Sequence, residues 1–267
     1  MTTLTMTPSA ADELTVRTRA TWMAGDFGKI AKSYEAGAAE FIARLNFQPR
    51  ARVLDVACGT GNLAIPAARS GAYVTGLDIA PNLIEQAQAW ARTEDLAIRF
   101  EEGDAEQMPY ADASFDAVVT MFGAMFAPRP NEVGTELVRV CRSGGRIAMA
   151  NWTADGFIGQ MFKIMTKHVP PAPGVPSPLQ WGHEATVAER LGDQLTDLRC
   201  TRARSPSIFR LVQRRPWNTS APTMAPPCAP LRSSVLTPRK HCVVSWCSFG
   251  RSTTAARTVS HRSIPPI

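Results

Sequence analysis

Apolar positions recur along this chain with two different periods, which predicts both helices and strands. Ala11–Ala24 and Ile30–Leu45 carry apolar residues at helical spacing, separated by the breaker Gly25-Asp26-Phe27-Gly28. From residue 51 onward, short β-branched runs alternate with helical stripes. The predicted strands are Val53–Val56, Ala72–Leu77, Ala97–Phe100, Phe115–Thr120 and Arg146–Asn151.

Helices are predicted between these strands. One covers Asn62–Arg69, a second begins at Pro81, and a third carries the stripe from Val133 to Cys141 and stops at Ser143-Gly144-Gly145. Strand–helix alternation at this spacing predicts right-handed crossovers and an α/β fold whose parallel sheet is covered on both faces. Ligands of such sheets bind at the carboxyl ends of the strands.

The alternation lapses after Trp152. Thr153–Gln180 contains a proline-rich segment, which we interpret as an insertion over the ligand edge of the sheet. Glu184–Leu191 is predicted to be helical, and Leu198–Leu211 is predicted to hold one more strand. From about Val212 the periodicity disappears.

Charge divides the chain into two unlike parts. Residues 1–197 hold 17 Lys and Arg and all 23 Asp and Glu, whereas residues 198–267 hold 12 basic and no acidic side chains. The net charge of +6 therefore comes from the tail. One interpretation is a disordered basic arm that binds a polyanion. The tail's content of Trp and Cys favours the other, a segment translated in a shifted reading frame and never selected to pack: Trp217, Trp246, Cys228, Cys242 and Cys247.

Cysteine use and hydropathy narrow the class of protein. The six cysteines have no paired spacing, so we expect reduced thiols and a cytoplasmic protein. The sequence lacks an apolar run of about 18 residues, so we expect no membrane span. No His/Cys group has zinc spacing and no carboxylate cluster suits magnesium, so no metal is expected. Because the main part of the chain is acidic, nucleic acid is not an expected partner.

A glycine turn carries the main chemical signal. VLDVACGTG (53–61) combines a strand with a turn that lets the backbone approach a ligand. Alone, it also fits a loose dinucleotide fingerprint or a plain tight turn. Asp55 sharpens the interpretation, because a carboxylate within a buried strand is costly unless a cation or hydrogen-bond donors meet it. A nicotinamide fold normally has an apolar residue at that position.

Two further carboxylates end the next two strands. Asp78 lies 17 residues after Gly61, where it can accept hydrogen bonds from both ribose hydroxyls, or cap a helix before Pro81. Asp104, in GDAEQMP, can accept from the exocyclic amine of a base, or serve as an ordinary turn residue. Together the three carboxylates match an ammonium, a ribose and an adenine. That set describes S-adenosylmethionine better than a dinucleotide.

The ordered motifs VLDVACGTG, VTGLDIAPNLIEQAQ, EEGDAEQMPYADASFDAVVT and ELVRVCRSGGRIAMANW resemble those of class I S-adenosylmethionine-dependent methyltransferases. The most similar group is the type 11 family, which includes ubiquinone and menaquinone biosynthesis enzymes. The resemblance covers about residues 15–211 and implies a Rossmann-like, doubly wound, mostly parallel sheet. Ser143 stands where that family commonly has proline. The family's sheet usually ends in an antiparallel strand, for which we expect no counterpart after residue 211.

The resemblance also implies an organisation and a cofactor site. The expected parts are a helical cap (1–50), an S-adenosylmethionine-binding core (51–152), a variable acceptor-side lid with the last strand (153–211) and an irregular tail (212–267). The expected cofactor-binding residues are Asp55, Ala57, Gly59, Gly61, Asp78, Ile79, Asp104, Ala105 and Met121.

The implied reaction is in-line displacement at the sulfonium methyl, for which the protein supplies alignment and excludes water. A general base helps if the acceptor is a hydroxyl or an acidic carbon. The catalytic candidates are His168 and His183 in the lid region and Tyr34 in the cap, although each residue type more often packs or lies on the surface. Trp152, Phe157 and Phe162 are candidates for an apolar acceptor pocket or for the core.

These observations predict a methyltransferase acting on a small molecule, by O- or C-methylation. The exit of the fourth strand, Thr120-Met121-Phe122-Gly123, lacks the Asn/Asp-Pro-Pro-aromatic turn of amino-methylating nucleic-acid enzymes. Two alternatives stay open at this point. One is an NAD(P)-dependent oxidoreductase, and the other is an inactive remnant that only binds a cofactor.

Overall fold

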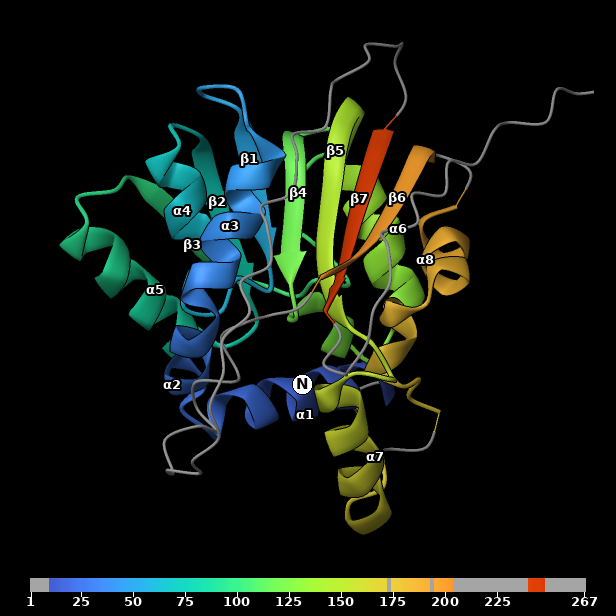
Figure 1. Cartoon of the computed structure of the whole chain (residues 1–267). Coiled ribbons are helices and arrows are strands. Elements are labelled where there is room, and N and C mark those ends of the chain that lie inside the picture. Colours follow the sequence, from blue (N-terminus) through green and yellow to red (C-terminus); the bar gives the residue numbers. More distant parts are fainter. Residues whose placement is uncertain (1–9, 172–173, 193–194, 204–239, 248–267) are drawn as a thin grey trace, which may run out of the picture.

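A computed structural model describes residues 10–171, 174–192, 195–203 and 240–247. These residues form a seven-stranded sheet of order β3-β2-β1-β4-β5-β7-β6 in which every neighbouring pair is parallel, with helices on both faces (Figure 1). The strands are β1 (Arg52–Val56), β2 (Tyr73–Asp78), β3 (Ile98–Glu102), β4 (Phe115–Met121), β5 (Cys141–Trp152), β6 (Leu195–Ala203) and β7 (Lys240–Cys247).

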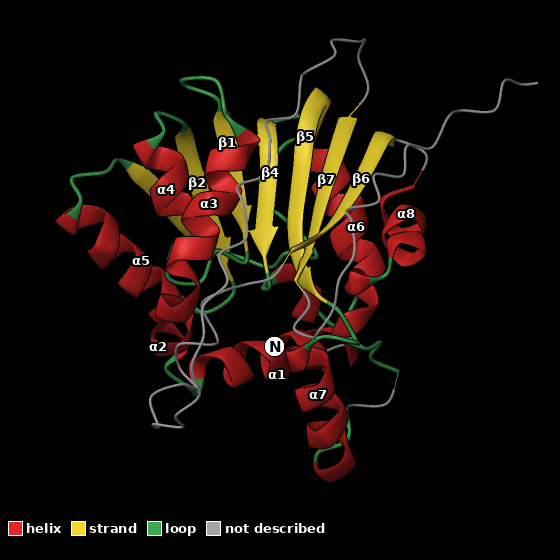
Figure 2. Ribbon diagram, in the orientation of Figure 1, coloured by secondary structure: helices red, strands yellow, loops and turns green. Residues whose placement is uncertain are grey.

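Helices connect the strands and cover the sheet (Figure 2). Pro81 and Pro130 each stand in the first turn of a helix, where a missing N–H costs least. No described helix is long and apolar enough to cross a membrane. The α-helices are α1 (Ala10–Met23), α2 (Phe27–Ala31), α3 (Glu35–Leu45), α4 (Ala64–Arg69), α5 (Pro81–Thr93), α6 (Pro130–Val140), α7 (Phe157–His168) and α8 (Glu184–Leu191), and the 3₁₀ helices are η1 (Lys32–Tyr34), η2 (Ala124–Phe126) and η3 (Pro178–Gly182).

The core has one layer on each face of the sheet. Successive strand residues point to opposite faces, so Val118 packs in one cluster with α6 and α8, and Val119 packs in the other with α3, α4 and α5. Both side chains are fully buried. Continuous apolar runs such as Ala117–Val119 are therefore explained by burial on both faces of a parallel sheet.

The structure confirms the predicted α/β class and the Rossmann-like arrangement of parallel strands. Three local predictions were wrong. Phe27 and Gly28 begin α2 and are not part of a breaker. The helix predicted to reach Ser143 ends at Val140, because β5 begins at Cys141, paired with Phe115. The insertion after Trp152 contains α7, whose apolar stripe we did not recognise beside the prolines.

Strand β7 corrects the expectation that no strand follows residue 211. It lies between β5 and β6 and pairs with both, with Ile147 opposite Cys242 and Leu198 opposite the same residue. The sequence from His241 to Trp246 is a short β-prone run, and a gap between two strands offers it hydrogen-bonding groups on both sides. β7 runs parallel to both neighbours, whereas the last strand of the type 11 methyltransferases is usually antiparallel. The rest of residues 212–267 lies outside the described ranges.

Candidate functional site

A cavity of about 580 Å³ lies at the carboxyl ends of the strands. Its floor is formed by the ends of β1, β2 and β4, and its walls come from α1, α2 and α7. Figure 1 shows α1 crossing below these strand ends, with α7 beside it. The volume is within the range of small-molecule and cofactor sites.

Asp55 is 1% exposed and lines this cavity near the end of β1. Its Oδ2 accepts a hydrogen bond of 2.9 Å from the backbone N–H of Ala64, the first residue of α4. Burial raises the pKa of Asp55 well above its usual value, more than this bond lowers it. The carboxylate therefore favours a cationic partner, and the ammonium group of an amino-acid tail has the matching charge.

Asp78 ends β2 and accepts two backbone hydrogen bonds, from Gly59 to Oδ2 at 2.8 Å and from Ala80 to Oδ1 at 2.9 Å. These bonds join the glycine turn to the second strand. Burial raises the pKa of Asp78, although both bonds oppose the shift. Ala80, not Asp78, is the N-cap of α5. Each carboxylate oxygen has a second lone-pair direction, so the side chain can still accept from ribose hydroxyls.

Asp104 lies beyond β3, where α1 covers it. Its Oδ1 accepts from the backbone of Glu106 at 2.9 Å, and its Oδ2 accepts from the Thr15 hydroxyl at 3.3 Å. Arg129 donates to Thr15 at 3.2 Å and also pairs with the buried carboxylate of Glu106 at 2.5 Å. The wall formed by α1 is therefore attached to the same loop that presents Asp104 to the cavity.

Two strand ends carry unusual backbone conformations. Ala57 after β1 and Phe122 after β4 have φ angles of 54° and 59°, which are uncommon for residues with side chains. A Cβ on Gly123 would lie 2.5 Å from the carbonyl oxygen of Ala57, so only glycine fits between these two strand ends. Such strain is often found at binding sites, because the surrounding fold must enforce it.

The structure brings together most of the predicted cofactor-binding residues. Gly61 (φ 92°) does not line the cavity; it lies behind the turn, where a Cβ would be 3.4 Å from Ile65. Cys58 does line it, but burial raises the pKa of its thiol well above the usual value, so a thiolate nucleophile is disfavoured. The predicted residues that line the cavity are Asp55, Ala57, Gly59, Asp78, Ile79, Asp104, Ala105 and Met121.

Of the three catalytic candidates, only Tyr34 lines the cavity. His168 and His183 are exposed and do not line the cavity, because one ends the projecting α7 and the other caps α8. Tyr34 lines it and packs against Phe122 and Trp152, with ring centroids 5.5 and 5.7 Å away. The Phe122 and Trp152 rings are stacked 3.7 Å apart. The structure thus keeps Tyr34 at the site and leaves both histidines outside it.

Sequence reasoning missed the residues that close the cavity. Most of these residues belong to helices that are distant in sequence from the glycine turn, so no motif near the turn predicts them. The α7 residues have one usable signal, since their spacing of three, four and seven places them on one helix face. Trp152 and Phe162 line the cavity, but Phe157 does not. The missed residues include Thr15, Thr18, Trp22, Phe27, Ile158, Met161 and Met165.

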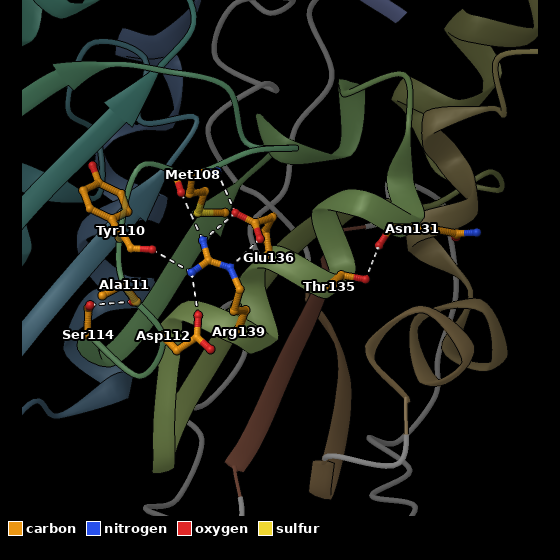
Figure 3. A network of polar contacts seen from close by, with 9 residues as sticks. All are labelled: Met108, Tyr110, Ala111, Asp112, Ser114, Asn131, Thr135, Glu136 and Arg139. Atoms are coloured by element: carbon orange, nitrogen blue, oxygen red, sulfur yellow. Dashed lines mark hydrogen bonds and ion pairs between the residues drawn. The ribbon is translucent and has the colours of Figure 1, made fainter.

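A polar network supports the loop that follows Asp104. Figure 3 shows Arg139 of α6 at its centre. Its guanidinium contacts Glu136 at 2.6 Å and Asp112 at 2.8 Å, and donates to the carbonyl oxygens of Tyr110 and Met108 at 2.6 and 3.0 Å. Glu136 in turn accepts from the Met108 N–H at 2.6 Å. The loop is therefore held at both ends, by Asp104 at the cavity and by this network.

Comparison with known proteins places the chain in a family. The family model described as a methyltransferase domain matches residues 54–149. An uncharacterized protein of Mycobacterium tuberculosis is 39% identical over 199 residues, 73% of each chain. A demethylmenaquinone methyltransferase of Deinococcus radiodurans is 41% identical over 143 residues, 52% of this chain and 58% of the relative. The solved YcgJ protein of Bacillus subtilis aligns with a TM-score of 0.49 and 21% identity, over 61% of this chain and 70% of that chain.

The residues matched by the family model, 54–149, run from β1 into β5 and so include the strand ends that form the cavity floor. The nicotinamide-dependent alternative is not supported, because the matching family is one of methyltransferases. The glycine turn, the strand-end carboxylates and the sequence relatives lead to one conclusion: the chain belongs to the class I S-adenosylmethionine-dependent methyltransferases.

Proposed function

We propose that this protein transfers a methyl group from S-adenosylmethionine to an oxygen or carbon atom of a small molecule with an apolar body. The observation that carries the proposal is that Asp55, Asp78 and Asp104, from three successive strand ends, line one largely apolar cavity. Two of them are buried carboxylates with raised pKa values, and a cationic nucleoside compensates their charge.

The residues present fit the cofactor. In the proposal, Asp55 faces the ammonium group, Asp78 accepts from the ribose hydroxyls, and Asp104 with the Ala105 backbone contacts the adenine. The cofactor supplies an electrophilic methyl group on a sulfonium. Asp104 must exchange its contact with Thr15 for one with the base, or accept both, since Oδ2 has a second lone-pair direction.

The protein's own contribution is alignment and the exclusion of water. The stacked Phe122 and Trp152 rings, together with the Tyr34 ring, form an aromatic wall of the cavity, which suits an apolar acceptor. During transfer the sulfur–methyl bond breaks and a bond from the acceptor atom to the methyl carbon forms, so the acceptor must lose a proton. We propose Tyr34 as the residue at the site that can orient the acceptor or relay that proton, because the two histidines lie elsewhere.

The proposed division of labour follows the chain. Residues 51–152 bind the cofactor, whereas residues 1–50 and 153–211 cover the acceptor side. This division is supported by the contribution of α1, α2 and α7 to the cavity walls. The tail, 212–267, has no part in the proposed chemistry.

Calorimetric titration of the full-length protein with S-adenosylmethionine, S-adenosylhomocysteine and NADH tests the proposal. We expect saturable binding of the two sulfur nucleosides and none of NADH. Saturable binding of NADH without binding of S-adenosylhomocysteine would overturn the proposal. Asp78→Ala should weaken binding of both sulfur nucleosides. Asp112→Ala is its matched control, because the Asp112 side chain is 79% exposed and does not line the cavity.

A further inference from the structure

Helix α7 projects away from the carboxyl edge of the sheet, next to α1 (Figure 1). Its inward residues Ile158 and Phe162 pack on the core cluster that includes Trp152. The rest of the helix is largely exposed, which is unusual for a helix with this many apolar residues.

An apolar stripe runs along the exposed part of α7. Met161, Ile164 and Met165 follow one another at spacings of three and one, and Val169 lies one turn beyond Met165. Their exposed fractions are 37%, 60%, 50% and 73%. Contiguous exposed apolar surface of this kind marks an interaction site in a protein that remains soluble when free.

The charged side chains on α7 are both lysines. Lys163 and Lys167 are exposed, and the sequence Phe157–His168 contains no Asp or Glu. An apolar stripe flanked by lysines is complementary to a surface that combines anionic groups with an apolar interior, as an anionic lipid bilayer does.

The same surface surrounds the mouth of the cavity. Three residues, Ile30, Met161 and Met165, line the cavity and are also exposed to solvent. The cavity therefore opens to solvent beside them. Lys29 and Lys32 flank Ile30, and Lys29 pairs with Asp26 at 3.0 Å. An apolar molecule leaving a bilayer at this surface would enter the cavity without crossing water.

We propose that the α7 surface, defined as Met161, Lys163, Ile164, Met165, Lys167 and Val169, docks on an anionic membrane surface, and that the acceptor is a lipid-soluble molecule drawn from the bilayer. The second half of this statement rests on the proposed function. The first half stands on the exposed stripe, its charges and its place at the cavity mouth. The docking is peripheral, with the helix lying in the interface.

Cosedimentation of the full-length protein with vesicles tests the docking. We expect binding to vesicles of equal parts phosphatidylglycerol and phosphatidylcholine, and at least tenfold weaker binding to phosphatidylcholine alone. Ile164→Glu is expected to weaken binding to the anionic vesicles at least tenfold, because it places a negative charge, which the anionic headgroups repel, within the apolar stripe. The matched control is Thr166→Glu, which adds the same charge on the opposite, exposed face of α7. It should lower binding less than threefold.

Binding of S-adenosylhomocysteine in solution separates this test from the proposed function. Neither Ile164 nor Thr166 lines the cavity, so both variants should bind the nucleoside as the unmodified protein does. Loss of vesicle binding with intact nucleoside binding supports the docking. Equal loss in both variants, absence of vesicle binding by the unmodified protein, or a dimer in solution that Ile164→Glu dissociates would overturn it. Failure to bind the nucleoside would overturn the proposed function and leave the vesicle result to decide the docking alone.

Discussion

Two groups of carboxylates, one lining the cavity and one in the network around Arg139, have pKa values shifted in opposite directions. At the cavity, Asp55 and Asp78 are buried and are held by backbone N–H groups, and burial raises the pKa of both. In the network of Figure 3, Glu136 is held by Arg139, whose hydrogen bonds lower the pKa of Glu136. The guanidinium's own pKa is raised in return.

This difference distinguishes the carboxylates that can bind a ligand from those that stabilise the fold. A carboxylate paired with arginine is already compensated, so it contributes to stability and offers little to a ligand. A buried carboxylate whose partners are only neutral N–H groups costs free energy until a cation or hydroxyl donors reach it. Among the described residues, the buried carboxylates that lack a cationic partner, Asp55 and Asp78, both line the cavity. The following predictions test that contrast.

The largest expected effect is on stability, from Arg139→Met. The change leaves Glu136, whose side chain is 13% exposed, without its cation and removes donors from two loop carbonyls. We expect the free energy of unfolding to fall by about 2–3 kcal/mol, measured by urea denaturation. Arg142→Met is the control, because its ion pair with Asp116 is more exposed and should contribute less than about 1 kcal/mol. Equal losses in both variants would contradict a special role for the network.

The next effect is on binding, from Asp78→Ala. We expect S-adenosylhomocysteine to bind about 1–3 kcal/mol more weakly, because the ribose hydroxyls lose their charged acceptor. The Gly59 and Ala80 N–H groups also lose their partner, so unfolding must be measured alongside. Asp78→Asn keeps an acceptor oxygen and should show the affinity loss with less destabilisation. An unchanged affinity in both variants would reduce Asp78 to a turn residue.

The pH dependence should have opposite signs in the two regions. Because burial raises the pKa values of Asp55 and Asp78, these carboxyls protonate above their usual range. Affinity for S-adenosylhomocysteine, measured between pH 8 and pH 5, should therefore fall as the pH is lowered. Their contribution to stability is present at low pH and is lost as pH rises through the raised values. The contribution of Glu136, with its lowered pKa, is instead lost as pH falls. Affinity that is flat across this range would contradict ionised carboxylates at the site.

The smallest effect is expected from Asp112→Ala. This carboxylate contacts Arg139 at 2.8 Å but is 79% exposed, so solvent screens the pair. We expect the free energy of unfolding to change by less than about 0.5 kcal/mol, and no change in nucleoside affinity. A loss comparable to that of Arg139→Met would mean that the outer half of the network carries its stability.

The sequence by itself determined the alternation of strands and helices from β1 to β5 and the place of the three carboxylates at the strand ends. A strand in a parallel sheet can only present its last residues at the carboxyl edge, so Asp55, Asp78 and Asp104 had to converge once the alternation was recognised. Pro81, at the start of α5, was similarly decisive, because its missing N–H is tolerated only in the first turn.

Only the tertiary structure decided what covers these carboxylates. Thr15 and Asp104 are in contact although 89 positions separate them in sequence, and neither residue type predicts that contact. The position of His168 outside the cavity depends on the direction in which α7 leaves the sheet, and the entry of β7 between β5 and β6 depends on which strand edges remain open. Periodicity records how one segment is buried, but contacts between distant segments depend on how their surfaces fit, which no single segment encodes.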